Sequence, residues 1–134
     1  MPVMNTTYQQ AFAQYKNSKI LTASPAELTL MLYDGTIKFL NIAEIAIEKK
    51  DMAKAHDNIM RAERIIDYLR ETLDMQYAVA QDFENMYSYI SRRLIEANIS
   101  KDPAILQELN GHMHEIRDTW VQVMKMNHMM VKEA

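Results

Sequence analysis

TASPAELTLMLYDGTIKFLNIAEIAI, the stretch from Thr22 to Ile47, decides the fold of this chain. It predicts a long helix with a well-defined start. Ser24 is a typical N-cap residue, Pro25 suits the first helical position, and Glu27 lies three residues after the cap, which completes a capping box. The residues after Glu27 are too apolar for a helix that buries only one side.

At about 100° per residue, the apolar residues of this helix fall on two roughly opposite faces. The first face consists of Leu28, Met31, Leu32, Gly35, Phe39, Ile42, Ala43 and Ala46. The second face consists of Leu30, Tyr33, Ile37, Leu40 and Ile47, and the polar residues Asp34, Lys38 and Asn41 lie between the two. We expect the second face to point outward, where a partner covers it. Cover by neighbouring helices is the alternative, and periodicity alone favours neither.

The composition is that of one soluble helical domain. The chain has 134 residues, 49% hydrophobic and 25% charged, and only 2 glycines and 3 prolines, which favours helices joined by short loops. It has no cysteine, so disulfides and thiolate metal sites are excluded. The net charge of −3 gives no reason to expect nucleic acid. No secretory signal is apparent and no apolar run is long enough to cross a bilayer, so we expect a cytoplasmic protein without membrane insertion.

The remaining sequence predicts three further helices, each with a stripe of apolar residues. The four helices span about 25–49, 51–73, 78–99 and 103–127, and Asp51 and the pair Asp102-Pro103 mark two of the starts. The expected buried stripes are Met52, Ala55, Ile59, Ala62, Ile66, Leu69 and Leu73; Val79, Phe83, Met86, Tyr87, Ile90, Leu94 and Ala97; and Ile105, Leu106, Leu109, Met113, Ile116, Trp120, Val123 and Met124. Four such helices with short connections predict an all-α, antiparallel up-down-up-down bundle over residues 22–134.

Residues 1–21 differ from the rest of the chain. They are polar, but Tyr8, Phe12 and Tyr15 share one helical stripe, and Ile20 and Leu21 follow. Isolated helices of this length are marginal. We therefore expect a mobile or loosely docked segment that caps a groove of the bundle; a frayed terminus is the alternative.

No motif predicts an enzyme or a cofactor site. The Glu-x-x-His pairs of di-iron bundles are absent, as are phosphate loops, nucleophile elbows and zincin motifs. Glu108 and His112 lie one turn apart, but a solvated pair is the simpler interpretation than a metal site. Asp34, next to Tyr33, is either a solvent-facing residue or an anchor for a partner.

The sequence resembles the flagellin-specific export chaperone family, FliS. The resemblance is carried mainly by the segment from Thr22 to Gly35, after a leader that contains Tyr8, Gln9, Gln10 and Tyr15. It continues through Tyr87, Tyr89-Ile90, Arg93-Leu94, Ala97-Asn98, Arg117 and Trp120. Ala26 stands where the family commonly has an acidic residue, and the turn after Leu73 lacks the glycines often found there.

The resemblance implies a cytoplasmic chaperone that binds the disordered C-terminal region of flagellin. It prevents premature polymerisation and delivers flagellin to the gate of the flagellar type III export apparatus. Combined with the outward face, it makes Leu30, Tyr33, Asp34, Ile37 and Leu40 the expected client-binding residues. The expected groove-capping residues are Tyr8, Phe12, Tyr15, Ile20 and Leu21. The alternative is a structural or adaptor bundle of the export system that self-associates, for example as a homodimer.

Overall fold

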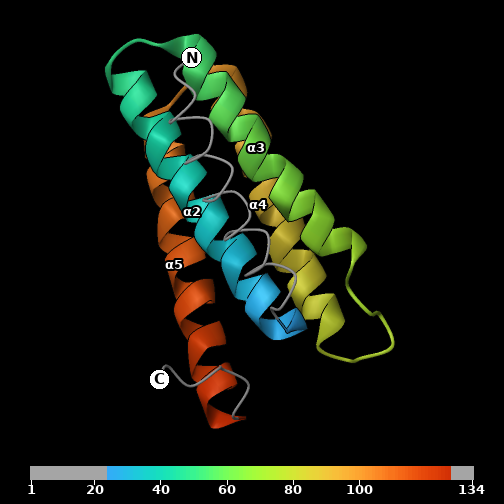
Figure 1. The fold of residues 1–134 in the computed structure, drawn as a ribbon. Coiled ribbons are helices and arrows are strands. Elements are labelled where there is room, and N and C mark those ends of the chain that lie inside the picture. The colour runs from blue at the N-terminus through green and yellow to red at the C-terminus, as the bar shows by residue number, and fades with distance from the viewer. Residues whose placement is uncertain (1–23, 128–134) are drawn as a thin grey trace, which may run out of the picture.

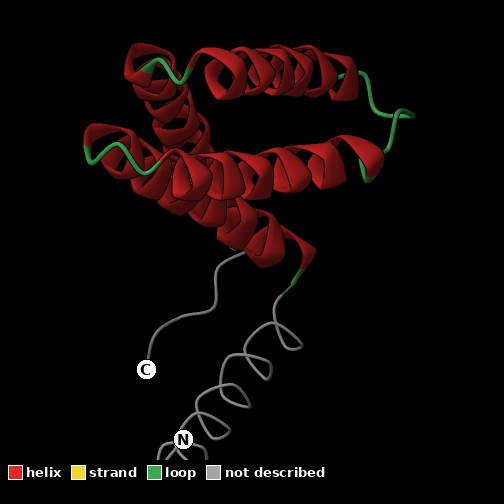
Figure 2. Cartoon of the chain, turned by 90° about the horizontal axis from the view of Figure 1, so that it is seen from above, coloured by secondary structure: helices red, strands yellow, loops and turns green. Residues whose placement is uncertain are grey.

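The chain forms an all-α bundle, as predicted. The computed structural model describes residues 24–127 and places four helices there: α2 (Pro25–Glu48), α3 (Met52–Glu71), α4 (Ala80–Ser100) and α5 (Pro103–Met126). Each helix begins and ends within two residues of the range expected from the sequence. Figure 1 shows the four helices side by side, and Figure 2 shows the loops that connect them, of which the one between α3 and α4 (residues 72–79) is the longest.

Each of the four helices has two neighbours in the bundle. Each helix packs against the next one along the chain, and α5 returns to pack against α2. The connections between α2 and α3 and between α4 and α5 span only residues 49–51 and 101–102, so consecutive helices run antiparallel. The contact between α4 and α5 is the least extensive of the four.

Local sequence signals position the helix starts. The backbone N–H of Glu27 donates to the Ser24 hydroxyl (3.1 Å), and the backbone N–H of Ser24 donates to the Glu27 carboxylate (3.0 Å), so the predicted capping box is confirmed. Asp51 and Asp102 cap α3 and α5 through their carboxylates. These bonds satisfy backbone donors that have no partner inside the helix.

The core contains the second apolar face of α2, which corrects our expectation. Tyr33 and Leu40 are each 1% exposed and Ile37 is 9% exposed, and all three belong to one cluster of buried side chains. The other members of this cluster are Ala43, Ile59, Ala62, Ile66, Leu69, Tyr87, Ile90, Leu94, Ala97, Leu106, Leu109 and Met113. Because α3 and α5 pack on either side of α2, the middle of the second face is enclosed by other helices and does not point outward, while Leu30 and Ile47 at its ends are half-buried.

The first apolar face of α2 is the one that remains partly exposed. Of its members, Leu28, Met31, Leu32, Gly35, Phe39 and Ile42 are half-buried, whereas Ala43 and Ala46 are buried. The Phe39 ring lies 5.7 Å from Lys38 and 5.7 Å from Arg61 of α3, at a distance that permits cation–π attraction. The side of α2 around Phe39 is therefore apolar, half-buried and next to positive charge, whereas the fully exposed positions of α2 are mostly polar.

Candidate functional site

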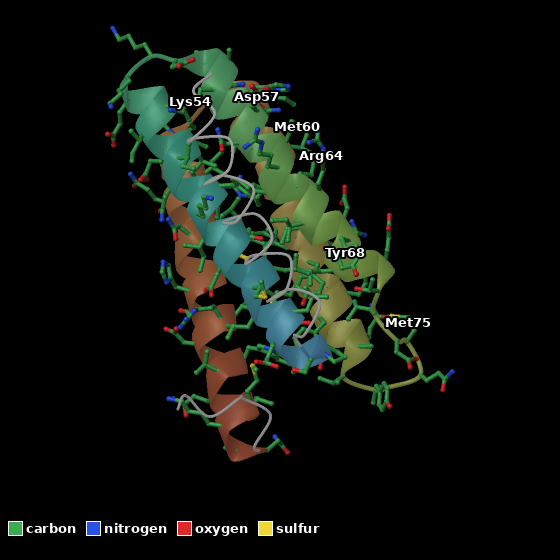
Figure 3. All side chains as sticks on the ribbon, viewed as in Figure 1. Lys54, Asp57, Met60, Arg64, Tyr68 and Met75 are labelled. Carbon is green, nitrogen blue, oxygen red and sulfur yellow. The ribbon has the colours of Figure 1, made fainter. Side chains whose placement is uncertain are left out.

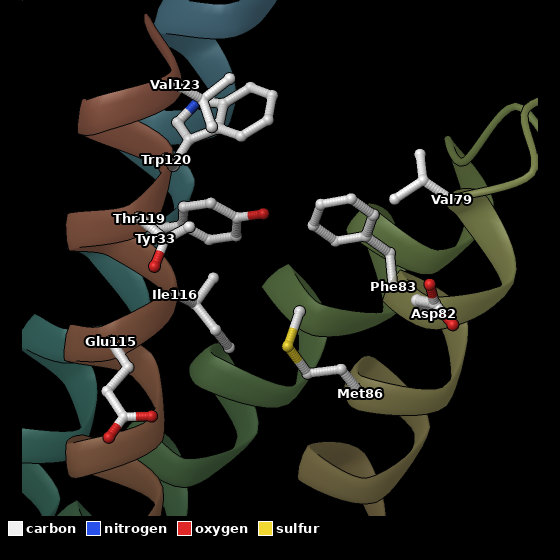
Figure 4. A pocket seen from close by; sticks show the side chains of 10 residues that line it. All are labelled: Tyr33, Val79, Asp82, Phe83, Met86, Glu115, Ile116, Thr119, Trp120 and Val123. Carbon is white, nitrogen blue, oxygen red and sulfur yellow. The ribbon is translucent and has the colours of Figure 1, made fainter. Parts of the chain in front are cut away.

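The bundle is open between the first half of α4 and the second half of α5. A hollow of about 580 Å³ lies there, shown in Figure 4. Its lining is Tyr33, Val79, Asp82, Phe83, Met86, Glu115, Ile116, Thr119, Trp120 and Val123. Apart from Asp82, Glu115 and Thr119, these side chains present carbon, sulfur or aromatic surface, so the hollow suits an apolar occupant.

A second hollow, of about 500 Å³, continues the first along the same two helices. It is lined by Asn85, Met86, Tyr89, Ile90, His112, Glu115 and Ile116. Met86, Glu115 and Ile116 border both hollows, so together they form one channel, which we name the α4/α5 groove. Between His112 and Val123 the helix α5 rises by about 16 Å at 1.5 Å per residue, which matches about three turns of a bound helix.

Half of the residues that line the groove are ones that the sequence pattern assigned to the core. Val79 and Val123 are 53% and 37% exposed, and Phe83, Met86, Ile116 and Trp120 are only partly buried. The assignment is wrong for Val79 and Val123. Where the hollow lies, the first half of α4 and the second half of α5 do not pack against each other. Val79 and Val123 therefore have no helix opposite them.

Two buried tyrosines support the groove from below. The hydroxyls of Tyr33 and Tyr87 lie 2.6 Å apart in a hydrogen bond between α2 and α4. Burial raises the pKa of both phenols, so both stay protonated. Trp120 packs edge-on against Tyr33 with ring centroids 6.3 Å apart, and its indole N–H donates to the carbonyl of Ala26 (2.9 Å). These contacts fix the aromatic wall to the start of α2.

A polar network joins α4 to α5 at the other end of the groove. The Glu108 carboxylate of α5 accepts hydrogen bonds from the Tyr89 hydroxyl and from Arg93 of α4 (2.8 Å), and His112 lies 3.3 Å from it. The bonds from Tyr89 and Arg93 lower the pKa of Glu108 to about 2. The carboxylate is therefore ionised at neutral pH and holds the two helices together where the groove ends.

The expected client-binding residues do not form one surface. Ile37 and Leu40 lie in the core, and Leu30 is half-buried. Tyr33 is buried too, but its ring borders the α4/α5 groove. Asp34 is exposed and accepts a hydrogen bond from Arg117 of α5 (2.8 Å), so it forms an ion pair within the chain.

The expected groove-capping residues lie outside the part of the chain that the structure describes. They are Tyr8, Phe12, Tyr15, Ile20 and Leu21. Their role stays a prediction.

Within residues 24–127, no group of three or more His, Cys, Asp or Glu side chains is placed to hold a metal ion. Glu108 and His112 do meet, but the other contacts of Glu108 are with Tyr89 and Arg93. None of the helices in this described range is both long and apolar enough to span a membrane. Within this range the α4/α5 groove is therefore the candidate site.

Comparison with known proteins identifies close similarity to one family. A sequence model described as "Flagellar protein FliS" matches residues 8–127. The flagellar secretion chaperone FliS of Bacillus subtilis is 38% identical over 117 residues, which cover 87% of this chain and 88% of that protein. The FliS of Salmonella typhimurium is 31% identical over 118 residues, 85% of this chain and 87% of that protein. The chaperone FliSB of Pseudomonas aeruginosa is 30% identical over 115 residues, 84% and 89% of the two chains.

Proposed function

The chain belongs to the FliS family, and from this membership we propose that it is a flagellar secretion chaperone whose client is flagellin. It binds the disordered C-terminal segment of flagellin in the cytoplasm, prevents polymerisation there, and delivers the subunit to the gate of the type III export apparatus. The observation that carries the proposal is the α4/α5 groove, an open apolar channel beside the packed core of the bundle.

The groove suits a segment that folds as it binds. A disordered chain with apolar residues at helical spacing gains its contacts by laying that stripe into an apolar channel. Binding of this kind typically buries ~1,000–3,000 Å² of surface, and ordering the disordered segment costs ~2–5 kcal/mol of the interaction free energy. The groove is about three turns long, so a longer client also requires a second surface, and the partly exposed apolar side of α2 around Phe39 suits that role.

The residues of α2 contribute to this site in different ways. Tyr33 contacts the client as part of the groove floor, because its ring borders the hollow. Leu30 and Asp34 lie at the edge of the buried face, with Asp34 held by Arg117. Ile37 and Leu40 act indirectly, since they hold α2 in the core.

Residues 1–21 compete with the client for the groove in this proposal. The described chain begins at Ser24, and the carbonyl of Ala26 already contacts Trp120 in the groove wall. In this proposal the stripe of Tyr8, Phe12 and Tyr15 supplies the apolar side chains that fill the groove. A weakly held cover lowers the apparent affinity for the client only by the fraction of time that the groove is closed.

The proposal is tested by calorimetric titration with the flagellin C-terminal segment. We expect binding with a large negative heat-capacity change, the mark of apolar burial. Thr119 is exposed and lines the groove, so Thr119→Trp fills the channel without entering the core, and we expect it to weaken binding by about tenfold, or about 1.4 kcal/mol. Thr119→Ser is the matched control and should bind like the unaltered protein.

Three results would contradict the proposal. They are the absence of binding, binding without a heat-capacity change, and equal affinities of the two Thr119 variants. Sedimentation of the unaltered protein addresses the alternative of a self-associating adaptor. If the protein is such an adaptor, its apparent molecular mass will rise with its concentration, and addition of the flagellin segment will leave that mass unchanged.

A further inference from the structure

Two carboxylates face the α4/α5 groove from opposite sides. Asp82 projects from α4 beside Phe83, and Glu115 projects from α5 below Ile116, as Figure 4 shows. Both side chains are exposed. Within residues 24–127, neither carboxylate has a hydrogen-bond or ion-pair partner.

Several other carboxylates on α2, α4 and α5 form ion pairs with arginines. Examples are the pairs Glu84 with Arg70 (2.7 Å), Glu108 with Arg93 (2.8 Å) and Asp34 with Arg117 (2.8 Å). The lining of the two hollows includes no lysine or arginine, and His112, its one histidine, lies against Glu108. The groove therefore combines an apolar floor with uncompensated negative charge on both rims.

We propose that Asp82 and Glu115 select the client by charge, so that the groove binds an amphipathic helix with Lys or Arg on both flanks of its apolar stripe. A helix seated in a channel places its stripe on the floor and its flanking positions next to the two rims, as at the edge positions of a coiled coil. Basic residues on the flanks meet Asp82 and Glu115, whereas acidic ones are repelled. This inference rests on the proposed function in one respect, which is that the flagellin segment is the natural client.

The rim charges affect mainly selectivity, association rate and salt dependence. Exposed ion pairs are weak, so each carboxylate should favour a basic flank over a neutral one by about twofold to fivefold at low salt. The two together should give a preference of about tenfold. At about 1 M salt the Debye length shrinks to about 3 Å, and the preference should nearly vanish.

The test uses two synthetic peptides of roughly 14 residues, or about 21 Å as a helix. They share one stripe of Leu and Ile and carry either Lys or Gln at every flanking position. Their affinities are measured for the full chain, for the Asp82→Asn/Glu115→Gln variant, and for the control Asp57→Asn/Glu71→Gln, which changes the net charge equally. Asp57 and Glu71 are exposed on α3, and neither lines the groove; Figure 3 labels Asp57 on that helix.

We expect the unaltered chain and the α3 control to prefer the Lys peptide by about tenfold at low salt, and the groove variant to bind both peptides nearly equally. Equal binding of both peptides by the unaltered chain overturns the inference. It is equally overturned when neither peptide binds, or when the preference survives in the groove variant. A failure of the flagellin segment to bind refutes the proposed function alone, because the peptide pair still reports on the two carboxylates.

Discussion

Replacing Tyr33 by Phe removes one hydroxyl from the buried pair that supports the α4/α5 groove. The hydroxyls of Tyr33 and Tyr87 are 2.6 Å apart, and both residues are almost fully buried. In Tyr33→Phe the Tyr87 hydroxyl loses this partner, and an unsatisfied buried polar group costs about 1–3 kcal/mol. Both rings border a small hollow of about 140 Å³, which is large enough to admit water, so we expect the lower part of that range, about 1–2 kcal/mol.

Urea unfolding, followed by circular dichroism, measures this loss. With a slope of about 2 kcal/mol per molar urea, the midpoint of Tyr33→Phe should fall by roughly 0.5–1 M. The double variant Tyr33→Phe/Tyr87→Phe should lose less than the sum of the two single variants, because no hydroxyl is then left without a partner. Tyr68→Phe is the control: Tyr68 is exposed on α3 (Figure 3), and its loss should stay within about 0.5 kcal/mol.

Additive losses in the double variant would refute this reasoning, because they would show that the two hydroxyls do not depend on each other. A single variant as stable as the unaltered protein would refute it as well. The affinity for the flagellin segment distinguishes a loss of stability from a change in the groove. Removal of the hydroxyl leaves the ring of Tyr33 in the groove floor. Tyr33→Phe should therefore bind the flagellin segment within about twofold of the unaltered protein at temperatures well below unfolding.

Two further predictions concern the polar end of the groove and the leader. Hydrogen bonds from Tyr89 and Arg93 lower the pKa of Glu108 to about 2 in the folded protein, so the ionised carboxylate stabilises the fold above its unfolded pKa and loses this effect as the pH falls from about 4.5 to about 2. The urea midpoint of Glu108→Gln should therefore decline less over that pH interval than the midpoint of the unaltered protein. Equal declines would contradict a stabilising role of the hydrogen bonds to Glu108. Deletion of residues 1–21 should raise the affinity for the flagellin segment and lower solubility; unchanged values of both in calorimetry and precipitation assays would count against a capping leader.

The sequence alone determined the local features of this fold. Ser24 and Glu27 form the predicted capping box, because a cap depends on residues three positions apart and on little else. Asp51 and Asp102 start the helices they were expected to start, for the same reason. The 3.6-residue periodicity predicted the four helices that residues 24–127 form, and short connections favoured an antiparallel bundle.

The tertiary structure decided which apolar face of α2 is buried. Both faces have helical spacing and similar hydrophobicity, so periodicity gives them equal weight. The choice depends on partners far away in the chain, such as Tyr87, whose hydroxyl meets that of Tyr33, and Arg117, which pairs with Asp34. The segment from Thr22 to Ile47 does not include those partners, so its own sequence cannot indicate which face they cover.

The tertiary structure also decided where the groove lies. Val79 and Val123 continue the apolar stripes of α4 and α5, and their spacing is the same as that of core residues such as Ile90 and Leu109. A stripe predicts which side of a helix avoids water, but it does not say whether a neighbouring helix reaches every turn of it. The sequence therefore determined which sides of the helices are apolar, and the three-dimensional path of α4 and α5 decided which of these sides no other helix of residues 24–127 covers.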